Sequence, residues 1–369
     1  MSALLALQLG SLISPAWACG CGAMVTDPAT RIGVHREASV LRWDGTTEQI
    51  VMRFTVDGNA PRAAWVMPVP TRATVEPADG RMFQQLDQLV APERRTRHHF
   101  WPRGGDWPFS SVAGDGAAAA APGAGAPGVG VVGREQLGDF DVARLTATDP
   151  DALRTWLRGN GFELSDGLAA ELRPYVDQKW EYVAVRLAPR QQGRVLRGTL
   201  DPLLIRFASD RLVYPMRLSR AARTPQSLSL YVLADHRMEP RSAIGGRAPE
   251  VTFAGPVDPP AFLAGLTGGH RTFLTAIDQS FPRPDRIDGD HELRATAADT
   301  PYRRVIYRDE LLTLGETGIP AWLLTVGAAL LAAGGAVAAL LVRRRRRRHL
   351  SLGAPRSGDP SVSGRAISD

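Results

Sequence analysis

The sequence predicts a β-rich α+β fold, with antiparallel sheets in two lobes and a few helices, followed by one C-terminal transmembrane helix. Several segments alternate apolar and polar residues like half-buried strands, a few carry apolar residues at helical spacing, and residues 319–342 contain no charge. The predicted parts are a signal peptide (1–18), a first lobe (19–112), an Ala/Gly/Pro-rich linker or loop (113–134), a second lobe (135–318), the transmembrane helix (319–342) and a basic, disordered cytoplasmic tail (343–369).

The first 18 residues are typical of a secretory signal peptide. An apolar run over residues 3–13 leads to Ala16-Trp17-Ala18, which has the small-x-small pattern of a cleavage site. Cleavage after Ala18 would make Cys19 the first residue of the mature chain, so lipidation of Cys19 is an alternative. Trp17 fits the lipoprotein pattern badly, and a lipid would duplicate the anchor at the other end of the chain. We therefore favour simple cleavage.

The first lobe is predicted to consist mainly of strands. Residues 49–56 alternate in polarity, and the turn signal Asp44-Gly45 indicates a hairpin with residues 39–43. A further strand is expected at residues 63–67. Over residues 79–90 the apolar spacing becomes helical, which indicates a helix packed on the strands.

The second lobe is predicted to mix helices and strands. Residues 113–134 before it contain too few large side chains to pack a core, so they indicate a boundary. Pro150 suits the start of one helix, and Ser165 is placed to cap another that runs to about residue 176. Strands are then expected at 181–187, 199–207, 211–218 and 227–233, a helix near 272–279, and a short strand at 304–307.

Two predicted strand pairs have similar sequences. Ile50-Val51-Met52-Arg53-Phe54 precedes Trp65-Val66-Met67-Pro68-Val69, and Leu203-Leu204-Ile205-Arg206-Phe207 precedes Leu212-Val213-Tyr214-Pro215-Met216. Each pair suggests a strand ending in Arg-Phe, a turn, and a second strand that a proline ends. We interpret them as a repeated hairpin. Duplication of one β-unit would explain the repeat, but we favour chance similarity between two amphipathic hairpins.

Residues 319–342 are predicted to cross a membrane. At about 1.5 Å per residue they would extend roughly 36 Å, more than a hydrocarbon core of about 30 Å. The positive-inside rule places the arginines that follow in the cytoplasm, so the preceding chain would lie outside the cell membrane. Gly335 and Ala339, four residues apart, would permit a homodimer through this helix. The arginines that carry the topology signal are Arg343, Arg344, Arg345, Arg346, Arg347 and Arg348.

The positive charge is concentrated in the predicted tail. Residues 343–369 contain eight arginines and two aspartates, a net charge of +6, and the whole chain also has a net charge of +6. The rest of the chain is therefore neutral, which removes the main support for nucleic acid as a partner. The expected partners are the lipid bilayer and another envelope protein or a cell-wall component.

The pair Cys19 and Cys21 is the sharpest local chemical feature. Cysteines two apart can bridge only in a tight turn, which Gly20 permits, and so small a loop adds little stability. A strained bridge is easily reduced, so thiol exchange is one interpretation, and binding of a soft metal such as Cu(I) or Zn(II) is another. We favour an inert buried pair, and no cofactor is predicted.

His98 and His99 are candidate auxiliary ligands for such a metal site. Adjacent histidines in a strand or loop usually point apart, and Trp101 and Trp107 lie close by in sequence. A loop rich in arginine and tryptophan more often packs or contacts a protein, and we favour that interpretation. The acid–histidine neighbours Asp235-His236 and His291-Glu292 are interpreted as structural.

Four parts of the chain carry a family resemblance: Ala18-Cys19-Gly20-Cys21-Gly22, the segment 64–70 (Ala-Trp-Val-Met-Pro-Val-Pro), residues 153–162 with 175–176 and 180–187, and residues 212–215 with 231–237. In these parts the chain resembles the domain-of-unknown-function 2330 family of exported bacterial proteins. The resemblance implies an exported, envelope-associated protein, often with a single membrane anchor. It supplies no catalytic residues.

The sequence contains none of the common local motifs of hydrolases, zinc proteases, P-loop proteins or dinucleotide-binding proteins, so no catalytic residue is predicted. The leading hypothesis is a single-pass type I membrane protein of the bacterial envelope that acts as a non-enzymatic binding or structural module. The alternative is an extracytoplasmic thiol-redox or soft-metal-handling protein that uses Cys19-Gly20-Cys21. A hydrolase with scattered catalytic residues ranks third.

Overall fold

The computed structural model describes residues 17–19, 22–27, 29–104, 106, 136–137, 140–145, 150–187, 194–258, 260–315 and 318–351. The chain divides into two compact units, one formed by residues up to 93 with residues 125–306, the other by residues 94–124 with residues from 307 onward. Most of the predicted signal peptide, the predicted linker at 113–134, Cys21, Trp107 and the tail from residue 352 lie outside the described residues.

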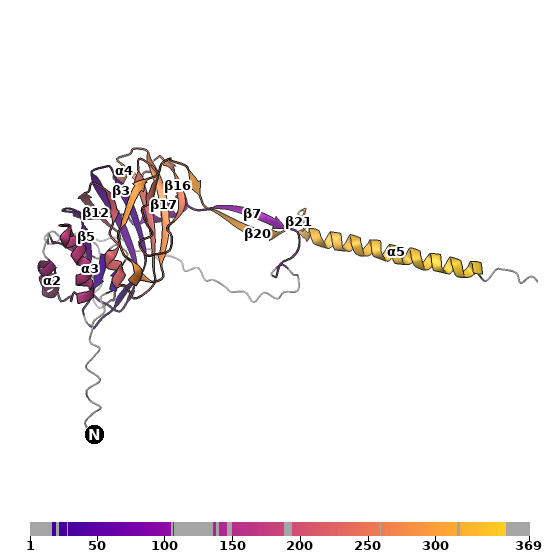
Figure 1. Ribbon diagram of the computed structural model, residues 1–369, viewed down its shortest axis with the longest axis horizontal. Helices are drawn as coiled ribbons and strands as arrows, with labels where there is room; N and C mark the ends of the chain where they lie inside the picture. Colours follow the sequence, from indigo (N-terminus) through magenta and orange to yellow (C-terminus); the bar gives the residue numbers. More distant parts are fainter. Residues whose placement is uncertain are drawn as a thin grey trace, which may run out of the picture. The chain divides into compact units, whose positions relative to one another are not determined.

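The first unit is built on two large β-sheets (Figure 1). All neighbours in both sheets are antiparallel except β14 and β3, which are parallel. The nine-stranded sheet has the order β19 (Tyr302–Arg303), β16 (Glu250–Val257), β17 (Thr272–Phe281), β14 (Gln226–Ala234), β3 (Ile32–Trp43), β4 (Thr47–Gly58), β12 (Leu203–Ala208), β6 (Thr74–Pro77), with β11 (Gly198–Thr199) also paired to β4. The six-stranded sheet has the order β1 (Trp17–Cys19), β2 (Gly22–Val25), β5 (Ala63–Val69), β10 (Glu181–Leu187), β9 (Phe140–Leu145), β8 (Gln136–Leu137).

Both sheets take strands from each side of residues 113–134, so the segments expected to form two lobes are interleaved in space. The first unit also contains a three-stranded sheet of β13 (Leu212–Tyr214), β18 (His291–Ala295) and β15 (Met238–Pro240), with β18 in the centre. Its helices are α1 (Arg81–Leu89), α2 (Pro150–Gly159), α3 (Asp166–Asp177) and α4 (Ala264–Thr267), with the short 3-10 helices η1 (Arg217–Ala221) and η2 (Pro284–Arg286).

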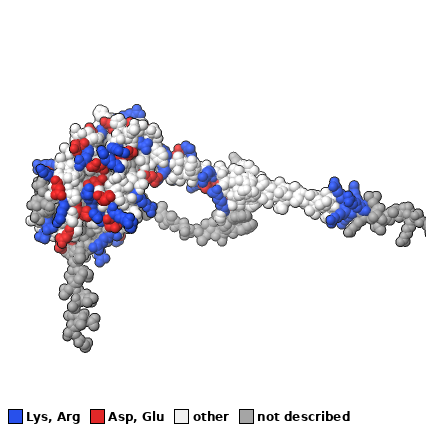
Figure 2. Space-filling view, in the orientation of Figure 1, with Lys and Arg blue, Asp and Glu red and all other residues white. Residues whose placement is uncertain are grey.

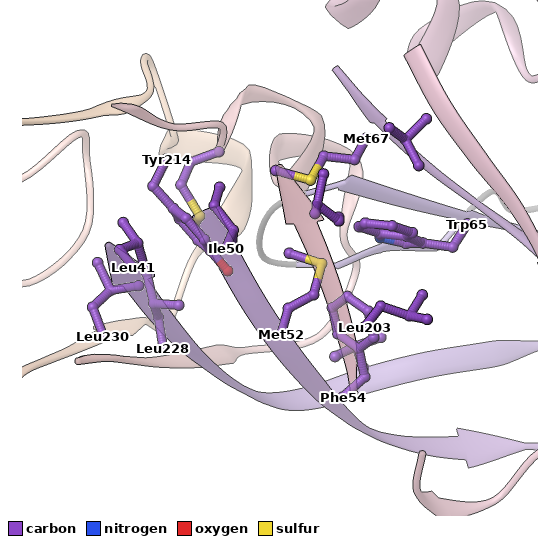
Figure 3. Close-up of a cluster of buried hydrophobic side chains, with 14 of the residues drawn as sticks. Leu41, Ile50, Met52, Phe54, Trp65, Met67, Leu203, Tyr214, Leu228 and Leu230 are labelled. Carbon is purple, nitrogen blue, oxygen red and sulfur yellow. The ribbon is translucent and has the colours of Figure 1, made fainter. Parts of the chain in front are cut away.

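Three apolar clusters show how these elements are layered. The largest lies between the two large sheets, where side chains such as Met52 of β4 and Trp65 of β5 are fully buried (Figure 3). On its other face, the six-stranded sheet packs against α2, α3 and η1 through residues such as Val66 and Leu168. The other face of the nine-stranded sheet packs against α1 and α4. The first unit is therefore two stacked sheets with helices on both outer faces.

Two glutamates lie in the layer between the large sheets. The hydroxyl of Tyr214 lies 2.6 Å from Ser39 Oγ and donates a hydrogen bond to Glu37. Glu37 is only 1 % exposed. The Val213 backbone N–H donates to Glu48 Oε2 at 3.1 Å, and burial raises the pKa of Glu48 well above its usual range. These bonds attach β13 to β3 and β4, and thereby fix the three-stranded sheet to the nine-stranded one.

The second unit contains most of a two-stranded ribbon of β7 (Glu93–His99) and β20 (Val305–Leu311), a small pair of β21 (Thr313–Leu314) and β22 (Ile319–Pro320), and the helix α5 (Ala321–Ser351). Residues 321–347 are long and apolar enough to cross a membrane, with a mean hydropathy of 2.1 in the most apolar window. Pro320 lies in β22, directly before the helix. α5 includes the six arginines 343–348, which gather beyond its apolar part (Figure 2).

The β-rich α+β fold class is confirmed, with several antiparallel sheets, few helices and one C-terminal apolar helix. The hairpin around Asp44-Gly45 is also present, because Trp43 of β3 pairs with Glu48 of β4 and Gly45 has a φ of +95°. Ser165 caps α3 by accepting a hydrogen bond from Leu168 N, as its position predicts.

The helix predicted near residues 272–279 is wrong, because these residues form the strand β17. This strand lies between β14 and β16. One of its faces packs against the cluster that includes α4, and the other faces the core between the two large sheets, so both faces are buried. A strand buried on both faces has a nearly continuous apolar run instead of an alternating one, and such a run resembles a buried helix in sequence.

The predicted repeated hairpin is also wrong. In each pair the first strand, β4 or β12, belongs to the nine-stranded sheet, whereas the second, β5 or β13, belongs to a different sheet. The two similar segments are instead direct neighbours, since β4 and β12 pair antiparallel with Val51 opposite Leu204. These two residues occupy equivalent positions in the similar sequences, so the strands are related by a local two-fold axis.

Candidate functional site

A polar pocket of about 360 Å³ opens in the first unit where the end of α3, the three-stranded sheet and the segment before β18 meet. It is lined by guanidinium and carboxylate groups with a small apolar wall. The lining residues are Gln178, Trp180, Arg211, Val213, Arg217, Arg241, Ser242, Ile244, Asp288, Gly289, Asp290 and Glu292. We call it the arginine–carboxylate pocket.

Glu292 is flanked by two arginines because it lies on the central strand of the three-stranded sheet. Val213 of β13 is its register partner on one side, and the backbone N–H of Arg241 donates to the Glu292 carbonyl on the other at 2.9 Å. Arg211 Nε lies 3.5 Å from Glu292 Oε1, and Arg241 Nε lies 3.6 Å from Oε2. Two guanidinium groups therefore share one carboxylate.

These contacts are long and partly solvated. The side chains of Arg211, Arg241 and Glu292 are between 42 % and 59 % exposed. Arg211 Nε is buried and makes no hydrogen bond within the described part of the chain. Half-exposed ion pairs of this kind contribute about 0–1 kcal/mol, so the two guanidinium groups can turn to a ligand at little cost in stability.

Asp290 differs from Glu292, because hydrogen-bond donors surround the Asp290 carboxylate. Its Oδ1 atom accepts from the Tyr175 hydroxyl at 2.5 Å and from the backbone N–H groups of Met216 and Arg217 at 2.7 and 3.1 Å. Its Oδ2 atom accepts from Arg217 Nε at 3.3 Å. Burial raises the pKa of Tyr175 well above its usual range, so this hydroxyl stays protonated and donates. Asp290 thus anchors α3 and η1 to the wall of the pocket.

The loop that follows β15 forms another wall, and its backbone is tightly constrained. Ile244 has a φ of +43° and Gly245 a φ of +78°, a region that a β-branched residue such as isoleucine rarely occupies. A Cβ atom on Gly245 would overlap the carbonyl oxygen of Arg286. Gln279 Nε2 donates to the carbonyl oxygens of Ala243 and Arg247 at 2.7 and 2.8 Å, so both ends of the turn are held. Strain of this kind persists where the surrounding structure enforces it.

Trp180 supplies the apolar part of the pocket. It follows α3, where Lys179 has a φ of +61° and the Trp180 backbone N–H donates to the Tyr175 carbonyl at 2.9 Å. Its ring packs against Tyr175 with centroids 5.1 Å apart, and the residue is 4 % exposed. The apolar wall of the pocket is therefore held in place by Tyr175 and the end of α3.

The pocket holds three arginines and three acidic residues and includes no histidine, cysteine or lysine among its lining residues. Arginine pairs bind carboxylates with fixed, bidentate geometry. The arrangement is thus suited to holding a small ligand that carries a carboxylate and a short apolar group.

Most of the predicted cysteine site lies outside the residues that the structure describes. Cys19 ends β1 opposite Gly22 of β2, its side chain is not among those described, and Cys21 lies outside the described residues. The redox or metal role of Cys19 and Cys21 stays a prediction. β1 begins at Trp17, so the last two residues of the predicted signal peptide belong to this strand in the described chain.

The structure places the predicted auxiliary ligands His98 and His99 at the end of β7 in the second unit. His99 Nε2 lies 2.7 Å from Asp106 Oδ2, and His98 is exposed. No group of three His, Cys, Asp or Glu side chains is arranged to hold a metal ion within the described ranges. A role for these histidines in a soft-metal site also stays a prediction.

Residues 15–294 match the model of a bacterial family whose description is "Uncharacterized protein conserved in bacteria" (DUF2330). The chain belongs to this family. All residues that line the arginine–carboxylate pocket lie within the matched segment, whereas α5 lies after it. No curated protein matches the chain. Among solved structures, the crystal structure of baculovirus P35 is similar at 8 % identity and a TM-score of 0.30, over 75 % of this chain and 98 % of that one.

Sequence analysis did not find the pocket. Arg211 directly precedes β13, Arg241 directly follows β15 and Glu292 lies in β18. These positions are far apart in the chain, and no local motif links them. In the sequence Glu292 stands out only as the neighbour of His291, and the fold separates the two side chains. His291 is 1 % exposed and faces the core beside Phe281, whereas Glu292 lines the pocket. Alternation along β18 is the one signal that separates the two residues.

Proposed function

We propose that the protein is a membrane-anchored binding module of the bacterial envelope, and that the arginine–carboxylate pocket receives a small ligand with a free carboxylate. The module lies outside the cell membrane, α5 crosses it, and the arginine block lies in the cytoplasm. Carboxylates of this kind end both cell-wall peptides and protein chains, so either source fits an envelope location.

One observation carries the proposal: two half-exposed guanidinium groups, Arg211 and Arg241, share the single carboxylate of Glu292 at 3.5 and 3.6 Å. Arg211 Nη1 also lies 3.8 Å from Asp210 Oδ1, so its contacts with carboxylates are long on both sides, and Trp180 and Ile244 line the same pocket. The rigid turn at Ile244 and Gly245 supports the arginine-bearing loop, and a preorganised site loses less entropy when a ligand binds.

Membrane anchoring rests on α5. Residues 321–347 contain an apolar window of which no part is buried within the structure. The arginines that follow stand together at the end of an uncharged surface, whereas acidic and basic side chains are interspersed on the visible face of the first unit (Figure 2). Positive charge at one end of an apolar helix favours the cytoplasmic side for that end.

The test is a calorimetric titration, in which N-acetyl-alanyl-alanine is added to the full chain in detergent micelles. The matched control ligand is the same dipeptide with its carboxylate converted to an amide. We expect binding of the acid and a clear loss of affinity for the amide, because only the acid can pair with Arg211 and Arg241. The Arg241→Gln variant should weaken binding of the acid about 10-fold, the usual worth of a charge-assisted hydrogen bond.

The Glu292→Gln variant distinguishes a binding site from a merely structural ion pair. It removes the carboxylate that competes with the ligand, so we expect tighter binding of the acid. Since the Glu292 contacts are half exposed, the variant should unfold at nearly the parent temperature. Equal affinity for acid and amide, or weaker binding by Glu292→Gln, would refute the ligand assignment.

A further inference from the structure

The connection between the ribbon and α5 is fixed by backbone hydrogen bonds between segments that are distant in sequence. The Leu312 N–H donates to the His99 carbonyl at 2.8 Å, and the Ala321 N–H donates to the Leu312 carbonyl at 2.8 Å. The end of β7 is thus linked through one residue to the first residue of α5. Phe100 and Trp101 follow His99 directly, so they lie near the start of the apolar helix.

These two aromatic residues and their neighbours present apolar surface to solvent. Trp101 is 62 % exposed, and its ring meets Phe100 at an angle of 86° with centroids 5.2 Å apart. Leu314 of β21 and Ile319 of β22 are 50 % and 43 % exposed. Large exposed apolar residues that gather at one place commonly mark an interaction site.

Ion pairs fix the loop that carries Trp101. Asp309 of β20 accepts from Arg97 Nε and Nη2 at 2.7 and 3.0 Å and from Arg103 Nη1 at 2.8 Å. Asp106 Oδ2 accepts from the Arg103 backbone N–H at 2.8 Å and lies 2.7 Å from His99 Nε2. Hydrogen bonds from Arg97 and Arg103 lower the pKa of Asp309 to about 2, so this carboxylate remains charged at any physiological pH. The loop is therefore held to the ribbon on both sides of Trp101.

We infer that Phe100 and Trp101, together with Leu314 and Ile319, form a second contact with the lipid bilayer, at the headgroup level of the leaflet where α5 begins. This inference rests on the proposed membrane anchoring. An apolar helix that starts at Ala321 places Ala321 near the edge of the hydrocarbon core, and the groups hydrogen-bonded to it lie in the headgroup region. Tryptophan is favoured at this level of a bilayer.

The experiment places a fluorescent thiol probe at single cysteines in the full chain, reconstituted into phosphatidylcholine–phosphatidylglycerol vesicles with bromine-labelled acyl chains. The background carries Cys19→Ser and Cys21→Ser. The probe positions are Trp101→Cys in the loop after β7, Thr96→Cys as an exposed control within β7, and Ala332→Cys within α5. Quenching by the brominated lipid reports contact with the bilayer.

We expect the probe at residue 101 to be quenched at least about twice as strongly as the probe at residue 96, since only the former lies at the interface. The probe at residue 332 should be quenched most. If residue 332 is quenched but residue 101 behaves like residue 96, the second contact is refuted and the anchor stands. If residue 332 is not quenched, the membrane-anchoring proposal itself fails.

Discussion

His291 and Glu48 are buried titratable residues in the first unit, and burial shifts their pKa values so that each favours the neutral form. Burial lowers the pKa of His291 to about 4 and raises the pKa of Glu48 well above its usual range. Neutral forms fit the apolar surroundings, but the shifts act on stability at opposite ends of the pH scale.

His291 should make the first unit sensitive to mild acid. The unfolded chain binds a proton at His291 below about pH 6.5 and the folded chain only below about pH 4, so stability falls as pH decreases between these values, by about 3 kcal/mol in total. In the His291→Gln variant the thermal midpoint should change less between pH 7 and pH 4.5 than in the parent. An equal decrease in both proteins would show that other groups cause the acid sensitivity.

Glu48 should act in the opposite direction. Above its ordinary pKa the unfolded chain loses the Glu48 proton while the folded chain retains it, so stability falls as pH rises. The Glu48→Gln variant keeps an oxygen that can accept from Val213 N and has no proton to lose. We expect it to unfold at a higher temperature than the parent at pH 8 and at a similar temperature at pH 5. A variant that is less stable than the parent at both pH values would contradict this account.

At the scale of elements, the turn after β15 is the part of the pocket that a single substitution should disturb most. Gly245 and Gly269 both have a φ of +78°, but a Cβ atom would overlap Arg286 only at Gly245 and would meet nothing at Gly269. Gly269→Ala should cost about 1 kcal/mol for the left-handed backbone alone. Gly245→Ala should cost clearly more, because the loop must also move away from Arg286.

Calorimetry with the dipeptide acid and thermal unfolding of both variants check this prediction. Gly245→Ala should also weaken binding, because Arg241 is carried by the displaced loop, whereas Gly269→Ala should bind like the parent. Equal effects of the two substitutions on stability would mean that the contact with Arg286 adds nothing. Normal binding by a destabilised Gly245→Ala chain would mean that the turn does not position Arg241.

Local patterns predicted several elements well and failed where the environment of an element decides its type. The hairpin at Asp44-Gly45 and the cap at Ser165 depend on a few neighbouring residues, and both are present. The segment from residue 272 became a strand because two partner strands and two apolar layers surround it. Which strand pairs with which is set by contacts between distant segments, so the pairing of β4 with β12 could not be derived from either segment alone.

The candidate pocket lies beyond sequence prediction for the same reason. Arg211 and Arg241, which line the pocket, become neighbours only because β13 and β15 flank β18. Sequence patterns instead single out residue types with distinctive chemistry, such as Cys19 and Cys21, and the role of these two residues stays a prediction. An arginine-rich sequence gives no means of telling a guanidinium group that lines a pocket from one that only solvates the surface.

At the scale of the whole molecule, the arginine block should determine on which side of the membrane the chain ends. Basic residues directly after an apolar segment resist transfer across a membrane, so the six arginines from 343 to 348 should hold the C-terminus in the cytoplasm. With an epitope tag added after Asp369, protease treatment of cells whose inner membrane is intact and accessible should digest the first unit and leave the tag protected. Replacing all six arginines by glutamine should expose the tag in a fraction of the chains.

The apolar part of α5 is unchanged in this variant, so the loss of protection would report charge and not hydrophobicity. The matched control replaces Arg356 and Arg365, which lie farther from the apolar segment and should matter little, since the effect of charge on orientation is strongest close to the helix end. A tag that is digested in the parent chain would reverse the proposed orientation. Release of the parent from membranes by an alkaline wash would show that α5 does not span the bilayer, and the pocket would then have to be assigned to a protein that is not anchored in this way.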